Sequence, residues 1–476
     1  MVFLLVTVSL TADWPQFRGP DGQGHSAEKG IPIHWNEDEN ITWKSAVPGQ
    51  GYSSPVIAGN QIWMTSSKDE GKSLHAVCLD KTTGKLLHDI EVLTTKDAGP
   101  RHKLNGYASP TSVLDGKHAF VHFGPRGTAC LDSAGKVIWK NTEFKYNAFQ
   151  GAASSLILHG DLLILTCDGT DKQFLVALDK HTGKTKWLQP RAHLERADAS
   201  SQRAINRMAY STPLIQTVNG KPQLICSGAF HSAAYDPASG KELWWFPYTG
   251  FSIVGRPSYG NGMFYIVGSI RQDHFCIFAV RPGKGELHEG QRVWQFSTGI
   301  GHVPSPILVG KEIYVVHDGG VAACLDALTG KELWRERLGG NHDASPIEIR
   351  SRIYFCNREG KTTIVAADSN FKILAKNQLK GTFKASPAVA DGALFLRSDT
   401  HLYRIEKPKQ LSGCLPETNR LPLGQAVNGS APSWFRSFPR WCAWNCPNID
   451  KEKGRFVFAL LAADQSLASH RNLISI

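Results

Sequence analysis

The chain has 476 residues, a length that suggests two or three domains unless one architecture of repeated units uses it all. Apolar residues make up 41% of the chain, enough for a large core, and its 45 glycines and 25 prolines are spread out, as suits many short strands and turns. The formal charge of +11 permits an anionic partner, but we expect no nucleic-acid partner, because no Lys/Arg run or nucleic-acid-binding motif occurs.

The first element is an apolar run at residues 2–10 that ends in Thr11-Ala12-Asp13. It is too short to cross a bilayer, which needs about 20 residues, and it is similar to the end of a secretory signal peptide, cut after a small residue. We expect residues 1–12 to be a remnant of such a peptide and the protein to be periplasmic or secreted, with no transmembrane segment and no lipid anchor. A buried strand is the alternative for this run.

One phrase recurs along the chain: an Asp, then Thr-Gly-Lys or Ser-Gly-Lys, then a Trp. It runs over residues 179–187 and returns with the same spacing at 236–244 and 326–334, with a shorter copy at 132–139 and a copy without the Trp at 80–88. The Asp accepts hydrogen bonds from the backbone of the turn, the Gly takes a positive φ, and the alternating flanks are strands. The phrase therefore predicts a hairpin in which the Asp is structural.

A second phrase, Ser-Pro or a close substitute followed by an apolar strand, precedes each hairpin. Proline is tolerated at the first residue of a strand, and a further strand lies between the two phrases. Each unit therefore has four strands, A to D, over about 40 to 58 residues, a period typical of propeller blades. Counting this phrase gives eight units, which begin near Ser54, Ser109, Ser154, Thr212, Arg256, Ser305, Ser345 and Ser386.

The last unit lacks its fourth strand. It has strand A after Pro387 and further strands at 393–397 and 402–405, whereas one strand of the missing type lies alone at 41–44. A propeller removes its open edge by pairing an N-terminal strand with the final blade. We therefore predict an all-β fold, an eight-bladed β-propeller of four-stranded antiparallel blades, closed by the N-terminal strand.

The predicted propeller covers residues 13–407, and the repeats stop beyond it. Residues 408–476 are predicted to be a C-terminal extension of unknown structure, which the closed ring does not need. The cysteines follow the repeats: Cys78 and Cys130 occupy a Cys-Leu-Asp context in which another unit has Ala177. A position that accepts Cys or Ala is a small buried packing position, so we expect mostly free, buried thiols.

The hairpin phrase resembles the PQQ-like repeat family of eight-bladed propellers, named after pyrroloquinoline quinone. The resemblance rests on residues 177–187 and their copies, and the opening stretch 13–20 is similar to the start of secreted bacterial members. In that family the Trp of one blade packs on the next blade and locks the ring. The resemblance assigns this docking role to Trp43, Trp139, Trp187, Trp244 and Trp334.

The same resemblance implies two kinds of function. Quinoprotein dehydrogenases of the family hold PQQ and Ca²⁺ and typically carry an adjacent Cys-Cys pair, which this sequence lacks, as it lacks a Cys-x-x-Cys-His haem site. We therefore expect a non-enzymatic scaffold or ligand- or protein-binding module, similar to BamB, with no cofactor and no metal. The alternatives are a PQQ- and Ca²⁺-dependent alcohol or sugar dehydrogenase, or another enzyme, such as one acting on polysaccharides.

The D-to-A connectors, which join the outermost strand of one blade to the innermost strand of the next, all lie on one face of a propeller. They carry cations and aromatic side chains that suit a carboxylate, sulfate or phosphate, or the face of a sugar ring. We assign no catalytic residue and expect a monomer that binds another protein, or an anionic or carbohydrate ligand, at the channel mouth. The predicted binding residues are Arg101, His102, Asn105, Tyr107, Arg203, Arg207, Tyr210, Arg256, His302, His342, Asp343 and Lys384.

Overall fold

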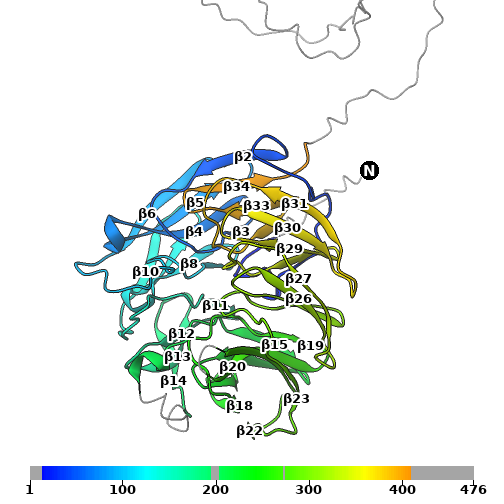
Figure 1. The fold of residues 1–476 in the computed structure, drawn as a ribbon. Helices are drawn as coiled ribbons and strands as arrows, with labels where there is room; N and C mark the ends of the chain where they lie inside the picture. The colour runs from blue at the N-terminus through cyan, green and yellow to red at the C-terminus, as the bar shows by residue number, and fades with distance from the viewer. Residues whose placement is uncertain (1–12, 194–202, 272–273, 409–476) are drawn as a thin grey trace, which may run out of the picture. The chain divides into compact units, whose positions relative to one another are not determined.

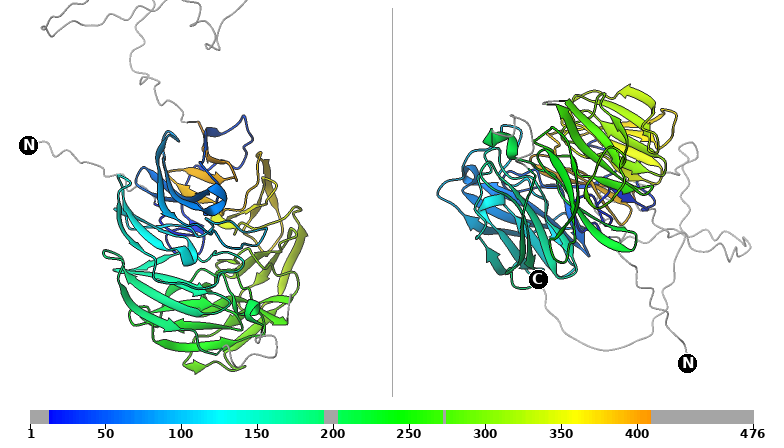
Figure 2. Two further views of the ribbon diagram at one scale, coloured as in Figure 1. Left: turned by 90° about the vertical axis from the view of Figure 1, so that its left-hand side faces the viewer. Right: turned by 90° about the horizontal axis from the view of Figure 1, so that it is seen from below.

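Nearly all regular structure in the protein is β-strand, arranged in eight sheets. The computed structural model describes residues 13–193, 203–271 and 274–408, which belong to the first of two compact units, residues 1–410. The sheets follow one another in chain order around an axis, each with four antiparallel strands, A innermost and D outermost (Figures 1 and 2). The predicted eight-bladed β-propeller is confirmed.

The first four blades share this A-to-D order, and blade 4 gains one strand from blade 5. Their strands are β3 (Val56–Ala58), β4 (Gln61–Lys68), β5 (Ser73–Asp80) and β6 (Leu86–Thr94); β7 (Val113–Leu114), β8 (His118–His122), β9 (Thr128–Asp132) and β10 (Val137–Asn141); β11 (Ile157–His159), β12 (Leu162–Asp168), β13 (Gln173–Asp179) and β14 (Thr185–Pro190); and β15 (Leu214–Val218), β16 (Lys221–Ser227), β17 (His231–Tyr235) and β18 (Glu242–Pro247) with β22 (Gly285–Glu286).

The last four blades follow the same plan, and blade 7 gains the N-terminal strand β1. Their strands are β19 (Ser258–Gly260), β20 (Met263–Arg271), β21 (His274–Val280) and β23 (Arg292–Phe296); β24 (Ile307–Val309), β25 (Glu312–Val316), β26 (Val321–Asp326) and β27 (Glu332–Arg337); β1 (His25–Ser26), β28 (Ile347–Ile349), β29 (Arg352–Cys356), β30 (Lys361–Ala366) and β31 (Ile373–Gln378); and β32 (Ala388–Ala390), β33 (Ala393–Arg397), β34 (His401–Ile405) and β2 (Ile41–Ala46). The described 3₁₀ turns are η1 (Asp69–Gly71), η2 (Gly124–Arg126) and η5 (Ala204–Arg207).

Strand β2 closes the ring as predicted. It pairs antiparallel with β34, with Ile41 opposite Ile405 and Ser45 opposite Leu402, and Figure 1 shows the blue strand beside the orange one. The ring of Trp43 packs on Phe395 of the same blade, with centroids 6.0 Å apart. The first and last parts of the propeller therefore share one sheet, which leaves no gap between blades 8 and 1.

Tryptophans of the D strands pack on the hairpin turn of the following blade, and this contact explains the glycine of the repeated phrase. The indole N–H of Trp139 donates to the carbonyl of Lys180, 2.8 Å away. Gly183 in the same turn has φ +70°, and a Cβ there would lie 2.5 Å from the ring of Trp139. The turn needs glycine twice, once for its positive φ and once for the close approach of the indole.

The contact between the tryptophan and the next blade differs where the hairpin turn of that blade differs. Trp43, Trp187 and Trp334 repeat the pattern, donating to the carbonyls of the turn residues Lys81, Pro237 and Asp368. Trp244 packs on the next blade through Phe264, but its N–H stays within its own blade, on Gln223. Blade 5 lacks the Asp turn there and instead sends β22 to pair with β18. Trp294, which lies outside the copies of the repeated phrase, makes the contact between blades 5 and 6.

The segment before β2 closes the axis at the end away from the D-to-A connectors. Trp14 forms a bridge with Ile57 in the A strand of blade 1, and β1 pairs with β28 of blade 7. The buried guanidinium of Arg18 donates to the carbonyls of Pro306 and Pro346. The stretch described from residue 13 onward therefore contacts A strands on several sides of the ring.

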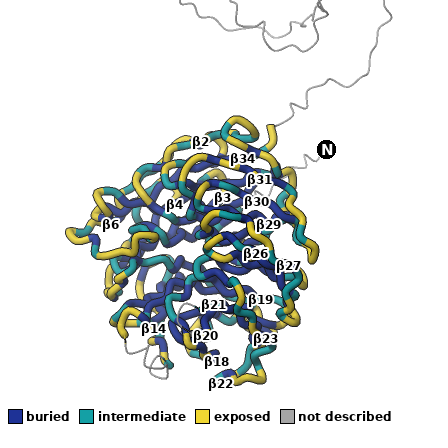
Figure 3. The backbone as a smooth tube through the Cα atoms, in the orientation of Figure 1, coloured by how far each residue is buried: buried dark blue, intermediate teal, exposed yellow. Residues whose placement is uncertain are grey.

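The core lies between neighbouring sheets, and the outermost strands, such as β6, are the exposed ones (Figure 3). The seven described cysteines are free and buried, which confirms that prediction for them; the other three lie outside the described residues, as do the segment assigned to a signal peptide and the C-terminal extension from residue 409 on. Among the residues that the structure describes, no helix is long and apolar enough to cross a membrane.

Candidate functional site

All eight D-to-A connectors contribute side chains to one cavity at the mouth of the axis. Its volume is about 320 Å³, and it is rimmed on one side by the exposed Leu104. We call this cavity the upper chamber. Its lining residues are Tyr52, His102, Leu104, Asn105, Ser109, Gln150, Ala153, Tyr210, Ser252, Val254, His302, Val303, Asp343 and Lys384.

Half of the twelve predicted binding residues line the upper chamber. The hydroxyl of Tyr210 donates to the side-chain oxygen of Gln150, 2.7 Å away, and the ring of His302 stacks on Phe275 with its Nε2 2.5 Å from the carbonyl of Ser252. These contacts hold side chains from three connectors, those of Gln150, Tyr210 and His302, in fixed directions around the mouth. The predicted residues that line the chamber are His102, Asn105, Tyr210, His302, Asp343 and Lys384.

The other predicted residues lie elsewhere. Arg101 is exposed and stacks over Tyr107, 5.0 Å from the ring centroid, while Arg203 and Arg207 belong to the connector that carries η5. His342 is 1% exposed, and burial lowers the pKa of its imidazole to about 4. The predicted set therefore divides into side chains that line the mouth, side chains on the same connectors that do not line it, and the buried imidazole of His342, with Arg256 deeper in the axis.

Lys384 is the one lysine that lines the upper chamber. Its Nζ donates to the carbonyl of Leu104 at 2.8 Å and lies 4.2 Å from the centroid of the Tyr52 ring. Desolvation by burial lowers the pKa of Lys384, and the nearby arginines Arg101 and Arg358 act in the same direction. An anion in the chamber would favour the charged form of this lysine.

Asp343 is the only carboxylate among the lining residues, and it is already paired. Both of its oxygens accept hydrogen bonds from Arg358, at 2.7 and 2.8 Å. A bidentate pair of this kind satisfies the carboxylate and neutralises its charge. The chamber therefore presents Lys384 and two histidines to a ligand without an opposing free acid among its lining residues.

Beneath the upper chamber lies a smaller one of about 90 Å³ on the axis, which we call the lower chamber. The two share eight lining residues, among them Tyr52, Tyr210 and Lys384, so they are two levels of one funnel. Phe17 of the N-terminal segment lines the lower level. The funnel is therefore open toward the D-to-A connectors and backed by that segment.

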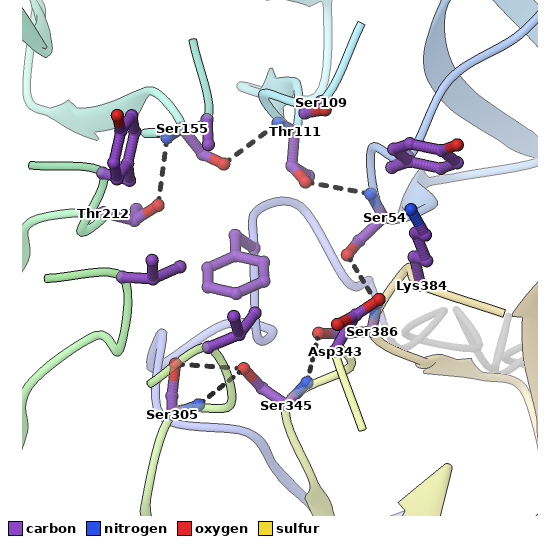
Figure 4. Close-up of a pocket in the computed structure, with 16 residues that line it drawn as sticks. Ser54, Ser109, Thr111, Ser155, Thr212, Ser305, Asp343, Ser345, Lys384 and Ser386 are labelled. Carbon is purple, nitrogen blue, oxygen red and sulfur yellow. Dashed lines mark hydrogen bonds between the residues drawn. The ribbon is translucent and has the colours of Figure 1, made fainter. Parts of the chain in front are cut away.

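A ring of hydroxyl side chains surrounds the lower chamber. Each hydroxyl accepts the backbone N–H of the equivalent residue in the preceding blade, at 2.9 or 3.0 Å, and the N–H of Ser386 donates to Ser54 across the junction of the last blade with the first (Figure 4). Blade 5, which has no hydroxyl at this position, interrupts the series. From the sequence, the Ser-Pro phrase predicts only the start of a strand and not this hydroxyl ring. The ring members are Ser54, Thr111, Ser155, Thr212, Ser305, Ser345 and Ser386.

Arg256 takes the place of a hydroxyl in blade 5. Its side chain turns toward the axis, where Nε and one terminal nitrogen donate to the carbonyl of Pro213 and the other donates to the carbonyl of Phe17 at 2.7 Å. It is 1% exposed, and desolvation lowers its pKa to about 9. The sequence placed this arginine at the open mouth, but its long side chain reaches the backbone carbonyls of the axis and stays inside.

A second polar cluster has the hydrogen-bond order of a Ser-His-Asp triad. Ser73 Oγ is 2.7 Å from His75 Nε2, and His75 Nδ1 is 2.8 Å from Asp89 Oδ1. The same Ser73 hydroxyl is also 2.5 Å from a carboxylate oxygen of Glu91, and the serine is 5% exposed. The cluster lies on β5 and β6 of blade 1 and includes none of the residues that line the funnel.

The residues present do not fit a quinone held by Ca²⁺. That cation prefers six to eight oxygen ligands with carboxylates among them, and the one carboxylate of the funnel is occupied by Arg358. Among the described residues, no group of three or more His, Cys, Asp or Glu side chains is arranged to hold a metal ion. No step through PQQ or Ca²⁺ follows from this donor set.

Comparison with known proteins gives one family match that covers most of the chain. The model of the family described as outer membrane protein assembly factor BamB, built on PQQ-like repeats, matches residues 28–143, 78–221 and 171–407. These overlapping segments together run from residue 28 to residue 407. The match therefore includes every blade of the propeller.

Two curated proteins are similar over shorter stretches. A tetrathionate hydrolase from Acidithiobacillus ferrooxidans is 24% identical over 190 residues, which are 35% of this chain and 38% of that protein. BamB from Burkholderia pseudomallei is 28% identical over 110 residues, 23% of this chain and 28% of that protein. The chain thus spans well under half of the length of each of these relatives.

Solved structures share the fold at low sequence identity. The crystal structure of BamB from Moraxella catarrhalis has a TM-score of 0.53 and 12% identity, covering 77% of this chain and 99% of that one. The quinohemoprotein alcohol dehydrogenase from Comamonas testosteroni has a TM-score of 0.60 and 11% identity, covering 88% and 83%. At these identities the likeness concerns the fold alone.

Proposed function

We propose that this chain, which belongs to the PQQ-like repeat β-propeller family of the outer membrane protein assembly factor BamB, is a non-enzymatic module that binds another protein through its D-to-A face. The family description and the BamB relative support a role in assembly at the outer membrane, and with it a periplasmic location. An acidic side chain of the partner enters the upper chamber.

The charge of the funnel carries this proposal. Lys384 stands at the mouth, and the one carboxylate there, Asp343, is already bonded to Arg358. Because the carboxylate of Asp343 is already neutralised by Arg358, the positive charge of Lys384 favours a partner that supplies an acidic side chain. Complementary charge at an interface makes the encounter of two proteins faster and more specific.

The surroundings of the mouth favour a protein partner. Leu104, Phe149 and Ile205 lie on three successive D-to-A connectors and are 44%, 47% and 40% exposed. Exposed apolar side chains beside a polar cleft are a property of protein-binding surfaces. An enzyme would need a free acid, base or nucleophile aimed into the cavity. The lining carboxylate is bonded to Arg358 and does not offer one, so that role would fall to His102, His302 or Lys384.

Binding of a short peptide tests the proposal directly. We expect an oligo-glutamate peptide to bind in calorimetry at low salt and an oligo-lysine peptide of equal length not to bind. Lys384→Gln should weaken the glutamate peptide about tenfold, whereas Lys117→Gln, at an exposed lysine outside the chamber, should leave it unchanged. Equal affinity for both peptides, or no effect of Lys384→Gln, would refute the proposal.

Reconstitution tests the dehydrogenase alternative. The expected result is no dye reduction with alcohols or aldose sugars after addition of PQQ and Ca²⁺. Turnover that requires both additions and disappears with a chelator would replace the binding function by that of a quinoprotein.

A second candidate function is hydrolysis of a sulfur oxyanion. The similarity to a tetrathionate hydrolase over 190 residues favours it, and a cationic funnel suits an anionic substrate. Incubation with tetrathionate, followed by measurement of the remaining tetrathionate and of acid release, separates the two functions. We expect no consumption above the rate in buffer; catalytic consumption that Lys384→Gln abolishes would favour the hydrolase.

A further inference from the structure

We propose that the lower chamber is a binding site for one small tetrahedral oxyanion, either free sulfate or phosphate or the terminal sulfo or phosphoryl group of a larger molecule. The inference deepens the proposed function, because it concerns the floor of the same funnel. It does not depend on a protein partner, because the site is complete within this chain.

The hydroxyl ring supplies the hydrogen-bond donors. A hydroxyl has one proton to donate and two lone pairs that can accept hydrogen bonds. The oxygen of each ring member uses one lone pair to accept a hydrogen bond from the backbone N–H of the preceding blade. Ser345 passes its proton to Ser305 at 3.0 Å. The other six hydroxyls donate to no acceptor among the described residues, and all six residues line the chamber: Ser54, Thr111, Ser155, Thr212, Ser305 and Ser386.

The ring holds these donors in place before a ligand arrives. Each oxygen is fixed by the N–H bond that links one blade to the next, so only rotation of the O–H remains to be restrained (Figure 4). Donors that are already positioned cost little ordering entropy when they bind. Donors spaced around a circle suit an acceptor with several oxygens pointing in different directions, as a tetrahedral oxyanion has, better than a flat carboxylate.

Positive charge in and around the ring favours an anionic ligand: Lys384 lines the chamber, the lining carboxylate Asp343 is bonded to Arg358, and two buried arginines lie outside the lining. Arg256 donates only to the carbonyls of Pro213 and Phe17. Arg397, which is 2% exposed, donates to the backbone and hydroxyl of Ser53, next to ring member Ser54, and to the carbonyl of Thr65. Neither guanidinium has a carboxylate partner among the described residues. A buried charge without a counter-charge is costly, and an anion in the chamber relieves that cost.

Size separates the two chambers. The lower one has a volume of about 90 Å³ and the upper one about 320 Å³. The smaller volume suits a single tetrahedral group better than a sugar or quinone ring, for which the upper chamber offers more space. The upper chamber, with its Tyr52 and Tyr210 rings, takes whatever the oxyanion is attached to.

Calorimetry with inorganic sulfate tests the site, at constant ionic strength and with nitrate and acetate as competing anions. We expect saturable binding of sulfate at one site per chain, with nitrate and acetate at least tenfold weaker. Thr212→Val removes one ring proton while conserving shape and should weaken sulfate binding about three- to tenfold. Thr217→Val, at an exposed position on β15, is the matched control and should leave the affinity unchanged.

A second variant keeps the test decisive if a ring substitution prevents folding. Lys384 lines both chambers and takes no part in the blade-to-blade ring, so Lys384→Gln should fold and should weaken sulfate at least tenfold, whereas Lys117→Gln should not. Absence of saturable sulfate binding, or equal affinity in the parent, Thr212→Val and Lys384→Gln proteins, would overturn the proposal.

Two further arms identify the source of the group and separate this site from the protein-binding function. Phosphoserine that binds more tightly than inorganic phosphate indicates a group carried on a larger molecule, and the reverse order indicates the free ion; both support the site. Loss of oligo-glutamate binding with sulfate binding intact refutes the protein-binding function alone. Loss of sulfate binding with glutamate binding intact refutes the oxyanion site alone.

Discussion

The backbone N–H of Ser386 donates to the hydroxyl of Ser54, 3.0 Å away, across the junction where the last blade meets the first. The two residues are 332 positions apart in the chain, and both line the lower chamber. The bond that closes the inner ring of the propeller is thus part of the wall of the candidate site. Ring closure and ligand binding share the same side chains.

Removing the acceptor of that bond should weaken the closed ring. We expect Ser54→Ala to lower the free energy of unfolding by about 1–3 kcal/mol, because the buried N–H of Ser386 loses its partner. Ser112 is the matched control: its hydroxyl is equally buried, but it has no hydrogen-bond partner among the described residues. Ser112→Ala should be neutral or stabilising in chemical denaturation. Equal losses for the two variants would show that the ring bond contributes nothing specific.

The glycine of the hairpin phrase allows both a positive φ and the close approach of a tryptophan ring. Two alanine substitutions can separate these two effects. In Gly160→Ala only the backbone is strained, because φ is +58° and no atom lies within 4 Å of the new Cβ. We expect the free energy of unfolding to fall by about 1–2 kcal/mol. Gly183→Ala adds the clash with the ring of Trp139, 2.5 Å from the new Cβ, for a total loss of about 2–5 kcal/mol. Thermal and urea unfolding measure both. A loss at Gly183 no larger than at Gly160 would contradict the docking contact.

A buried ion pair in blade 3 should show strong coupling. Asp168 Oδ1 lies 2.7 Å from Arg191 Nε, with both side chains at most 2% exposed. Asp168→Asn leaves the buried guanidinium without its counter-charge and should cost about 3–5 kcal/mol. The double variant Asp168→Asn with Arg191→Met should recover part of that loss, and the double-mutant cycle measures it. Additive losses in the two single variants would show that the pair does not interact.

The Ser73–His75–Asp89 cluster is expected to be structural despite its triad order. The Ser73 hydroxyl also contacts Glu91, and the serine is nearly buried, so access and a free proton for the base are both lacking. We expect no labelling by a fluorophosphonate probe, while Asp89→Asn lowers the unfolding free energy by about 1–3 kcal/mol through the lost bonds to His75 and Lys68. Labelling that disappears in Ser73→Ala would instead reveal a nucleophile.

The pH dependence of anion binding should follow Lys384. Its pKa is lowered by desolvation, with Arg101 and Arg358 acting in the same direction and Asp343 opposing them. The charged form binds the anion, so sulfate affinity should be highest below this pKa and fall as the pH rises through it, before the ordinary range of lysine near 10.4 is reached. Sulfate keeps its charge across this range. In Lys384→Gln the fall should be absent, and a parent profile flat to pH 10 would exclude the role of this lysine.

The sequence by itself determined the architecture, because the signals that encode it are local. The Asp-x-x-Thr-Gly-Lys turn at 179–184 and the alternating strands around it specify each hairpin within a few residues. Repetition of that unit gives the blade count. The unpaired strand at 41–44 and the missing fourth strand of the last unit give the closure, which β2 and β34 form.

Half of the predicted binding residues line the upper chamber, because the repeats locate the D-to-A connectors in the sequence. The tertiary structure alone decided the hydroxyl ring and the lower chamber, because their residues meet only when the ring has closed. The contact between Thr111 and Ser155 joins positions 44 residues apart, and no local pattern distinguishes a serine that begins a strand from one that also points its oxygen at the axis. The same reason explains why Arg256 was expected at the mouth but turns inward, and why Phe17 was not expected in the funnel. Whether a side chain points toward the axis depends on how the eight blades assemble. Whether a segment forms a turn or a strand depends on its neighbouring residues in the sequence.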